Sequence, residues 1–245
     1  MGHRSDRWVA LFSGGKDSSY ALWLALERGL AVDRLVTVHP PENSHLYHVP
    51  ATALTALAGE SIGIPVVDVR PEAFDVDAEM DSSARGDAEI EPLEATLAAL
   101  DDEVDGNLAG IVVGAVESRY QHDRITSLAE RLECDVFAPL WRRDPLTLLE
   151  SMVTDGFEIM IVDVAAAGLD DSWLGRTIDE DTIGTLEALR EEYGVHPIGE
   201  GGEYESLVVD GPHMDRKMAI EYEPAWDGTR GSIDVTDARL VERDG

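Results

Sequence analysis

A buried strand, a glycine turn and a buried helix follow one another near the start of the chain, and this order restricts the fold more than any other feature. The apolar run Trp8 to Phe12 ends in Ser13-Gly14-Gly15, and the almost wholly apolar segment Ser18 to Arg28 follows. The short run is typical of a buried strand, whereas the longer segment favours a helix. The sequence therefore predicts a βα unit whose tight loop presents backbone amides at a helix N-terminus.

Strand and helix patterns alternate through the first half of the chain. Gly110 to Val116 is apolar without alternation, as expected of a strand covered by helices on both faces. The alternation predicts βαβ units and a parallel sheet. The other expected strands are Arg34 to His39 and Ile64 to Val69, and the expected helices are Ala51 to Ile62, Leu93 to Val104 and Ile125 to Leu132.

The pattern changes beyond Asp135, where strands and helices no longer alternate regularly. Expected strands include Glu158 to Val162 and Ser206 to Asp210, with helices near Pro145 to Thr154 and Asp179 to Tyr193. We therefore predict an α/β protein with two domains. A parallel-sheet domain covers residues 1–132, and a smaller mixed α/β domain covers residues 133–245.

The chain is strongly acidic, with 19 Lys and Arg against 50 Asp and Glu and a formal net charge of −31. Such a surface repels nucleic acid, so we expect no direct nucleic-acid contact. Lys16 and Lys217 are the only lysines, which indicates adaptation to high internal salt, where the screening length falls to about 3 Å at 1 M. The acidic stretch Glu72 to Glu91 follows no metal-ligand spacing and predicts a solvated loop.

Cysteine usage and hydropathy favour a cytoplasmic protein. The single cysteine, Cys134, excludes an internal disulfide and a two-cysteine sulfur relay within one chain, and a buried thiol is expected there. We find no secretory signal and no bilayer-spanning segment, so we expect a reducing cytoplasm and no membrane partner. His39, His45 and His48 invite a zinc interpretation, but no cysteine or HExxH helix accompanies them.

The loop Ser13-Gly14-Gly15-Lys16-Asp17-Ser18 has the chemistry of an anion site. Two glycines let the chain turn tightly, while backbone amides, two hydroxyls and the Lys16 ammonium converge on one point. The Walker spacing is absent, and a carboxylate directly after the lysine suits Mg²⁺ beside bound phosphate. We expect Asp17 to be that ligand.

Two further motifs carry polar side chains that forming the predicted strands and helices does not require, so these side chains are candidates for ligand binding. Gly114 to Arg124 begins at the end of a buried strand, where open α/β sheets bind ligands, and it would place Tyr120 and Arg124 on one helix face. Gly199 to Glu205 holds three glycines and three carboxylates, which repel one another unless something cationic lies among them. An ordinary surface helix and a flexible acidic hairpin are the alternatives.

SGGKDS resembles the PP-loop of the ATP pyrophosphatases. With ESRYQHDR, PLW, GLDDSWLGR and GEGGEYESLVVDGP, it makes the chain similar to the diphthine-ammonia ligase family from about Val9 onward, as a salt-adapted, archaeal-type member. GEGGEYES is the most diagnostic piece. Ser206 stands where that family often has Thr, a departure that keeps the hydroxyl.

The resemblance implies a HUP-type PP-loop domain followed by a substrate-binding domain, and the last step of diphthamide synthesis. ATP would activate the carboxylate of diphthine on translation elongation factor 2, and ammonium would supply the nitrogen that displaces AMP. A homo-oligomer is compatible with this assignment. The implied ATP-binding residues are Ser13, Gly14, Gly15, Lys16, Asp17, Ser18 and Gly114; the substrate-binding residues are Glu117, Ser118, Tyr120, Gln121, Arg124, Gly201 and Gly202; the catalytic residues are Lys16, Asp17, Glu200, Glu203 and Glu205.

Three other functions share some of these motifs. A paralogous ligase that amidates a small carboxylic acid, for example in corrinoid salvage, would differ only in substrate. A transfer-RNA modifying enzyme should show a basic face or paired cysteines, and neither is found. A nucleotide-sensing module would bind ATP without releasing pyrophosphate, but it leaves the carboxylates of GEGGEYE unexplained.

Overall fold

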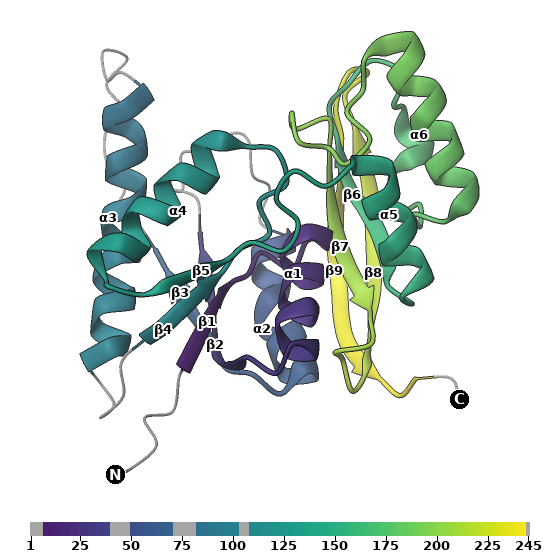
Figure 1. The fold of residues 1–245 in the computed structure, drawn as a ribbon. Coiled ribbons are helices and arrows are strands. Elements are labelled where there is room, and N and C mark those ends of the chain that lie inside the picture. Colours follow the sequence, from purple (N-terminus) through teal and green to yellow (C-terminus); the bar gives the residue numbers. More distant parts are fainter. Residues whose placement is uncertain (1–6, 40–49, 71–81, 103–107, 244–245) are drawn as a thin grey trace.

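The computed structural model describes residues 7–39, 50–70, 82–102 and 108–243, and Figure 1 shows them as two lobes side by side. The first lobe alternates strands and helices as predicted. Its strands are β1 (Arg7–Leu11), β2 (Ala31–Val38), β3 (Val66–Val69), β4 (Leu108–Val112) and β5 (Asp135–Phe137), and its helices are α1 (Lys16–Glu27), α2 (Pro50–Ile62), α3 (Ser82–Asp102) and α4 (Arg119–Arg131).

The five strands form a parallel sheet in the order β3-β2-β1-β4-β5. Strand order therefore reverses between β1 and β4, whose residues pair as Val9 with Ile111 and Ala10 with Val112. In such sheets, ligands bind outside the carboxyl ends of the strands at this switch point. The SGGKDS loop follows β1, and the loop from Gly114 follows β4, so the fold brings the first two motifs together.

The second lobe is an antiparallel sheet with two helices on one side. The strand order is β7-β6-β9-β8, and every pair in it is antiparallel. Its elements are α5 (Pro145–Thr154), β6 (Glu158–Val164), the short 3-10 helix η1 (Asp171–Trp173), α6 (Glu180–Tyr193), β7 (Tyr204–Asp210), β8 (Lys217–Trp226) and β9 (Gly231–Val241).

Helices α1 and α2 lie between the two sheets, whereas α3 and α4 cover the opposite face of the parallel sheet and α5 and α6 the outer face of the second sheet (Figure 1). One core cluster joins side chains of α1, such as Leu22 and Ala25, to Ile161 and Leu207 of the second lobe. A second cluster lies under α3 and α4. Burial of α1 from both sides explains why its sequence is apolar almost all round.

Residues of the types that commonly cap helices occupy several helix ends. Asp144 accepts a hydrogen bond from the Thr147 N–H at 3.0 Å just before α5, and Pro145 occupies the first turn. Asp179 accepts from the Thr182 N–H at 2.8 Å before α6, and Gly194 ends that helix with φ 75°. These caps account for the agreement between the predicted and observed bounds of both helices.

The structure differs from the sequence-based expectations in two places. The predicted loop is wrong from Ser82 onward, because α3 begins there; its apolar stripe is narrow and Pro92 lies inside the helix, which hides the helical pattern. The sequence patterns also missed β8 and β9, whose many exposed residues weaken the alternation. Residues 72–81, His45, His48 and Val104 lie outside the described residues.

Sheet membership bears on where the two domains divide. β5 pairs with β4 and so belongs to the first sheet, a little beyond residue 132. We propose that the division falls between Phe137 and Pro145. In the described ranges, no helix is long and apolar enough to cross a membrane.

Candidate functional site

The loop between β1 and α1 leaves the start of the helix open. Gly14 has φ 79°, which favours glycine, and Gly15 is the N-cap without a side-chain cap hydrogen bond. The hydroxyls of Ser13 and Ser18 lie 3.2 Å apart and brace the loop, since Ser18 Oγ also donates to the Gly15 carbonyl at 3.1 Å. First-turn amides of a helix without a local cap suit an anion.

Lys16 is buried between the two lobes, with only 4% of the residue exposed. Its Nζ donates to the Ile198 carbonyl oxygen at 2.5 Å and lies 3.0 Å from Asp17 Oδ2. The same atom lies 5.1 Å from the centre of the Tyr204 ring. Burial alone would lower the pKa of Lys16, but Asp17 and Tyr204 outweigh it and raise the pKa, so the ammonium stays charged.

Strand β7 of the second lobe contacts the SGGKDS loop of the first, which we call the phosphate loop after the ligand expected there. The Lys16 backbone N–H donates to Ser206 Oγ at 3.2 Å, and the Val208 N–H donates to the Gly14 carbonyl at 2.9 Å. A Cβ on Gly15 would lie 3.2 Å from the Ser206 carbonyl oxygen, so this close approach also favours glycine there. Both lobes therefore contribute to the predicted anion site.

Close packing against the first turn of α1 requires glycine at position 114. A Cβ at this position would lie 2.6 Å from the Asp17 carbonyl carbon and 2.8 Å from the Ser18 nitrogen. These are backbone atoms, which cannot move without shifting the phosphate loop. Gly114 thus lets the end of β4 meet the start of α1, a role that the sequence did not reveal.

The start of α4 and the two residues before it hold five of the seven residues predicted to bind substrate, the others being Gly201 and Gly202. Ser118 caps the helix by accepting from the Gln121 N–H at 3.3 Å. The Arg124 guanidinium stacks on the Tyr120 ring at 4.0 Å, and Tyr120 is 47% exposed. Glu117 faces the second lobe, because its Oε2 lies 2.9 Å from His196 Nε2 there. The expected Tyr120 and Arg124 pair is present, with its aromatic ring at the surface.

The GEGGEYE segment forms a tight loop that leads into β7. Gly199 and Gly202 have φ 72° and 80°. The Glu203 carboxylate accepts from the His196 N–H at 3.1 Å and the Gly201 N–H at 2.8 Å, so it braces its own loop. Tyr204 is buried and donates its hydroxyl to the Pro197 carbonyl at 2.7 Å. Among the three carboxylates of this segment, Glu203 therefore stabilises the loop itself.

Glu205 lies in β7 opposite Asp163 of β6. The residue is exposed at the surface, yet desolvation and the Asp163 carboxylate raise its pKa, against the attraction of Lys16. Glu200 is partly buried in the loop before it. A carboxyl with a raised pKa beside a phosphate loop is suited to hold a cation or exchange a proton.

The sequence predictions missed three residues that the fold brings to the site. His196, Ile198 and Ser206 contact Glu117, the Lys16 ammonium and the Lys16 amide, respectively. Ser206 was noticed only as a departure from a family pattern. The position of His196 a few residues before the glycine loop is a weak indication in the sequence that it belongs to the site. Ile198 acts through its backbone carbonyl, which every residue has, so the sequence gives no indication of its role.

The side chains at the site could hold Mg²⁺ only together with bound phosphate, which would supply the other ligands. Asp17 Oδ1 is buried and has no hydrogen-bond partner in the described part of the chain. Across those same residues, no group of three or more His, Cys, Asp or Glu is arranged to hold a metal. Mg²⁺ often takes one or two carboxylates and completes its shell with substrate phosphates. His39 instead pairs with Asp68.

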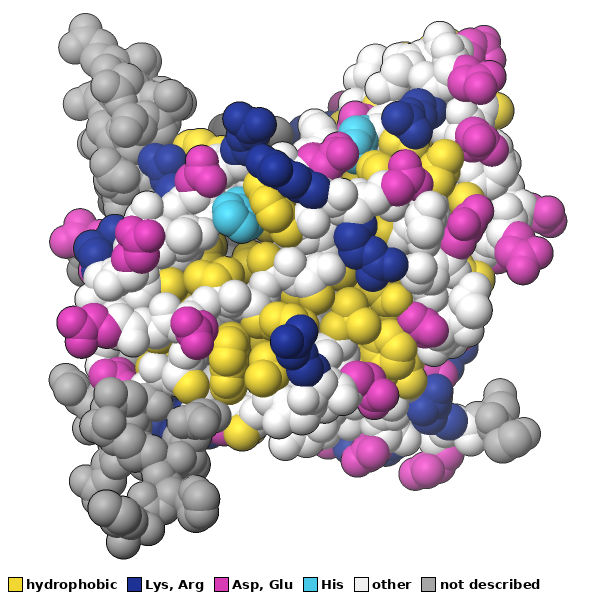
Figure 2. Space-filling view, in the orientation of Figure 1, with side chains coloured by type: hydrophobic (Ala, Val, Ile, Leu, Met, Phe, Trp, Pro, Cys, Tyr) yellow, Lys and Arg dark blue, Asp and Glu magenta, His cyan; other side chains and the backbone are white. Residues whose placement is uncertain are grey.

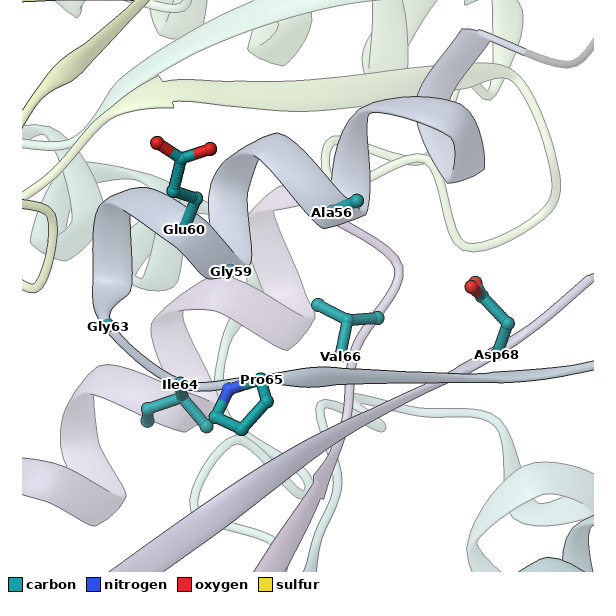
Figure 3. Close-up of a pocket in the computed structure, with 8 residues that line it drawn as sticks. All are labelled: Ala56, Gly59, Glu60, Gly63, Ile64, Pro65, Val66 and Asp68. Atoms are coloured by element: carbon teal, nitrogen blue, oxygen red, sulfur yellow. The ribbon is translucent and has the colours of Figure 1, made fainter.

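A hollow on the first lobe lies apart from these residues. It is lined by the end of α2 and the beginning of β3 (Figure 3). A Cβ on Gly59 would lie 2.4 Å from a methyl of Val66, and Glu60 pairs with Arg216 at 2.7 Å, so the helix packs closely here. The lining residues are Ala56, Gly59, Glu60, Gly63, Ile64, Pro65, Val66 and Asp68, none of which was predicted for the site.

Charge is unevenly spread over the face that shows both lobes. In Figure 2, several Lys or Arg side chains stand near the middle of the view with a few Asp or Glu side chains among them, whereas more Asp and Glu side chains lie toward its left and right margins. A protein with a net charge of −31 thus keeps cations in the region where the two lobes meet. This arrangement lowers the electrostatic cost of bringing in a phosphorylated ligand.

A parallel sheet with a phosphate loop at its switch point, closed by an antiparallel lobe, defines an α/β protein of the PP-loop type. Family models for the N-terminal and C-terminal domains of diphthamide synthase match residues 6–134 and 144–241. The chain belongs to the diphthamide synthase family.

Relatives named diphthine–ammonia ligase match most of the chain. The Danio rerio protein is 33% identical over 223 residues, which cover 88% of this chain and 86% of that protein. The Homo sapiens protein is 33% identical over 226 residues, covering 88% and 83%. A solved structure from Methanocaldococcus jannaschii, described as a predicted subunit of tRNA methyltransferase, is 18% identical with a TM-score of 0.42 and covers 84% of this chain and 97% of that one. That likeness carries no functional argument.

Proposed function

We propose that this protein is a diphthine–ammonia ligase: it uses ATP to activate the carboxylate of diphthine on translation elongation factor 2, and ammonium supplies the amide nitrogen, with AMP and pyrophosphate as products. The observation that supports the proposal is the contact of β7 with the SGGKDS loop, because the GEGGEYE loop leads into β7 and therefore lies close to the proposed nucleotide site. Its family membership agrees with this activity.

The phosphate loop would hold the pyrophosphate part of ATP. The amides of Gly14 and Gly15, with the Ser13 and Ser18 hydroxyls, supply donors, and Lys16 adds a fixed positive charge. Asp17 would hold Mg²⁺, which neutralises phosphate charge when bound. Because Lys16 is already oriented by Ile198 and Asp17, little reorganisation opposes the growth of charge on the leaving pyrophosphate.

Residues at the lobe junction would hold the acceptor. The first turn of α4 offers a cation and polar donors for the α-phosphate or the diphthine carboxylate, and the GEGGEYE loop offers carboxylates for the trimethylammonium group or ammonium. Glu205, with its raised pKa, suits the second task. We assign substrate contacts to Glu117, Ser118, Tyr120, Gln121, Arg124, Gly201 and Gly202, and cation contacts to Glu200, Glu203 and Glu205.

The test is a complete reaction. The protein is incubated in concentrated KCl with Mg-ATP, ammonium and diphthine-bearing elongation factor 2, and AMP, pyrophosphate and the modified histidine are followed by mass spectrometry. AMP formed together with the amide supports the ligase. AMP that appears only with a small carboxylic acid would move the assignment to a paralogous ligase, and ATP binding without AMP would favour a sensing module.

A further inference from the structure

His196 connects the two lobes at the site, and nothing above assigns it a chemical role. Its Nε2 lies 2.9 Å from Glu117 Oε2 on the loop after β4, and its backbone N–H donates to Glu203 Oε1 at 3.1 Å. The ring also lies near Asp17 of the phosphate loop. The imidazole therefore lies where the nucleotide, α4 and GEGGEYE parts of the site meet.

The hydrogen bond to Glu117 sets the proton positions on the ring. An ionised carboxylate only accepts hydrogen bonds, so Nε2 carries the proton in the neutral imidazole and Nδ1 holds the lone pair. His196 Nδ1 is buried and has no hydrogen-bond partner within the described ranges. A buried acceptor without a partner costs stability, so its retention in a binding site needs an explanation.

A purely structural link between the lobes would not need this arrangement. Nε2 and the backbone N–H already make the contacts that hold His196 in place. The orphaned atom is the one that could accept a proton, and the carboxylate on the far side of the ring would stabilise the resulting imidazolium. A carboxylate that orients a histidine in this way is the usual support for a general base.

We propose that His196, oriented by Glu117, is the general base that converts ammonium into ammonia for attack on the activated diphthine carboxyl. This role rests on the ligase function proposed above. Nδ1 takes one proton from ammonium, and the freed lone pair on nitrogen forms the C–N bond to the acyl carbon. The bond from that carbon to the AMP oxygen then breaks, its electron pair leaves with AMP, and the second nitrogen proton passes to water.

His196→Gln separates this role from a structural one. The Gln side-chain amide can still donate to Glu117 from the position of Nε2, but it has no lone pair at Nδ1. His39→Gln is the matched control, because His39 also pairs with a carboxylate, that of Asp68, and has no assigned role. Thermal unfolding establishes that both variants are folded. Glu117→Gln is a second variant that keeps an acceptor for Nε2 but removes its charge.

Three assays on the whole protein with diphthine-bearing elongation factor follow the two half-reactions. Diphthine-dependent exchange of labelled pyrophosphate into ATP reports adenylation alone. We expect His196→Gln to keep this exchange, while amide formation from ammonium falls by about 10²- to 10⁴-fold, the usual contribution of a general base. Hydroxylamine, which is largely a free base at neutral pH, should restore acyl transfer to near the unmodified protein's rate, with a hydroxamate as product.

Equal losses with ammonium and hydroxylamine, or loss of the exchange itself, would overturn the general base and leave His196 as a link between the lobes. In Glu117→Gln, a smaller loss in the rate of amide formation from ammonium, also restored by hydroxylamine, would support the role of Glu117 in orienting His196. If the unmodified protein shows no diphthine-dependent exchange, the ligase function fails, and the role of His196 fails with it.

Discussion

The backbone N–H of Lys16 donates to the hydroxyl of Ser206, 190 residues further along the chain. This bond joins the first turn of α1 to the antiparallel lobe, and Ser206 is only 6% exposed. If the SGGKDS loop holds ATP as proposed, we expect ATP binding and the position of the second lobe to be coupled through this one hydroxyl.

Ser206→Ala should weaken ATP binding without unfolding the protein. A buried amide that loses its partner costs about 1 kcal/mol, so we expect roughly a five-fold rise in the ATP dissociation constant. Ser206→Thr keeps the hydroxyl and is the control, with affinity close to that of the unmodified protein. Isothermal titration with a non-hydrolysable ATP analogue measures both, and equal affinities for the Ala and Thr variants would refute the coupling.

Local patterns were sufficient for the layers of the fold but not for the contacts between them. The buried strand near Gly110 and capped helices such as α5 follow from neighbouring residues, so they could be predicted, although β4 is Leu108–Val112 and ends before the predicted Val116. The docking of β7 on the phosphate loop depends on residues far apart, and no periodicity records it. For this reason Ser206 and His196 entered the site only through the structure.

Gly114→Ala should disturb the phosphate loop directly. The new Cβ would lie 2.6 Å from the Asp17 backbone, which has no flexible side chain to move aside. We expect a loss of about 1–3 kcal/mol in the free energy of unfolding, typical of overpacking, together with weaker ATP binding. Chemical denaturation and nucleotide titration give the two quantities.

Gly184→Ala is the matched control for that change. Gly184 lies in α6, and a Cβ there meets nothing within 4 Å. Alanine at this helical position should stabilise the protein by about 0.5–1 kcal/mol and leave ATP binding unchanged. If Gly114→Ala behaved like Gly184→Ala, the close contact between β4 and α1 would be excluded.

His213 should make the protein less stable in mild acid. Its ring stacks on Phe157, both ring nitrogens are buried without partners in the described part of the chain, and desolvation, helped by Arg243, lowers its pKa from 6.5 to about 4. Between these values the unfolded chain binds a proton that the folded protein does not, so stability falls as the pH drops through this window. Allowing for partial exposure of the residue, we expect a loss of about 2 kcal/mol.

The difference between the unmodified protein and His213→Phe isolates this contribution. Carboxylates also titrate below pH 5, but they do so in both proteins. Denaturant unfolding at pH 7 and pH 4.5 should show that His213→Phe loses less stability on acidification. His122→Phe, at a histidine stacked on Trp141 at 4.0 Å, should retain the full loss. Parallel pH profiles for all three proteins would exclude the role of His213.

Concentrated KCl should stabilise the fold. With 50 acidic and 19 basic residues, most carboxylates have no cation to pair with, and their mutual repulsion is screened as the Debye length falls from about 10 Å at 0.1 M to about 3 Å at 1 M. A gain of a few kcal/mol would raise the melting temperature by about 10 °C. A melting temperature that is independent of KCl would contradict the proposed salt adaptation.

The ion pair between α3 and α4 should respond to salt in the opposite direction. Arg131 holds Glu94 through two hydrogen bonds of 2.9 and 2.6 Å, and both side chains are partly exposed. Arg131→Gln should cost up to about 1 kcal/mol in dilute buffer and less in 2 M KCl, because screening weakens this attraction. Both proteins are measured across the same salt series. Screening of the general repulsion stabilises both proteins alike, whereas screening of the Arg131–Glu94 attraction makes their stabilities converge.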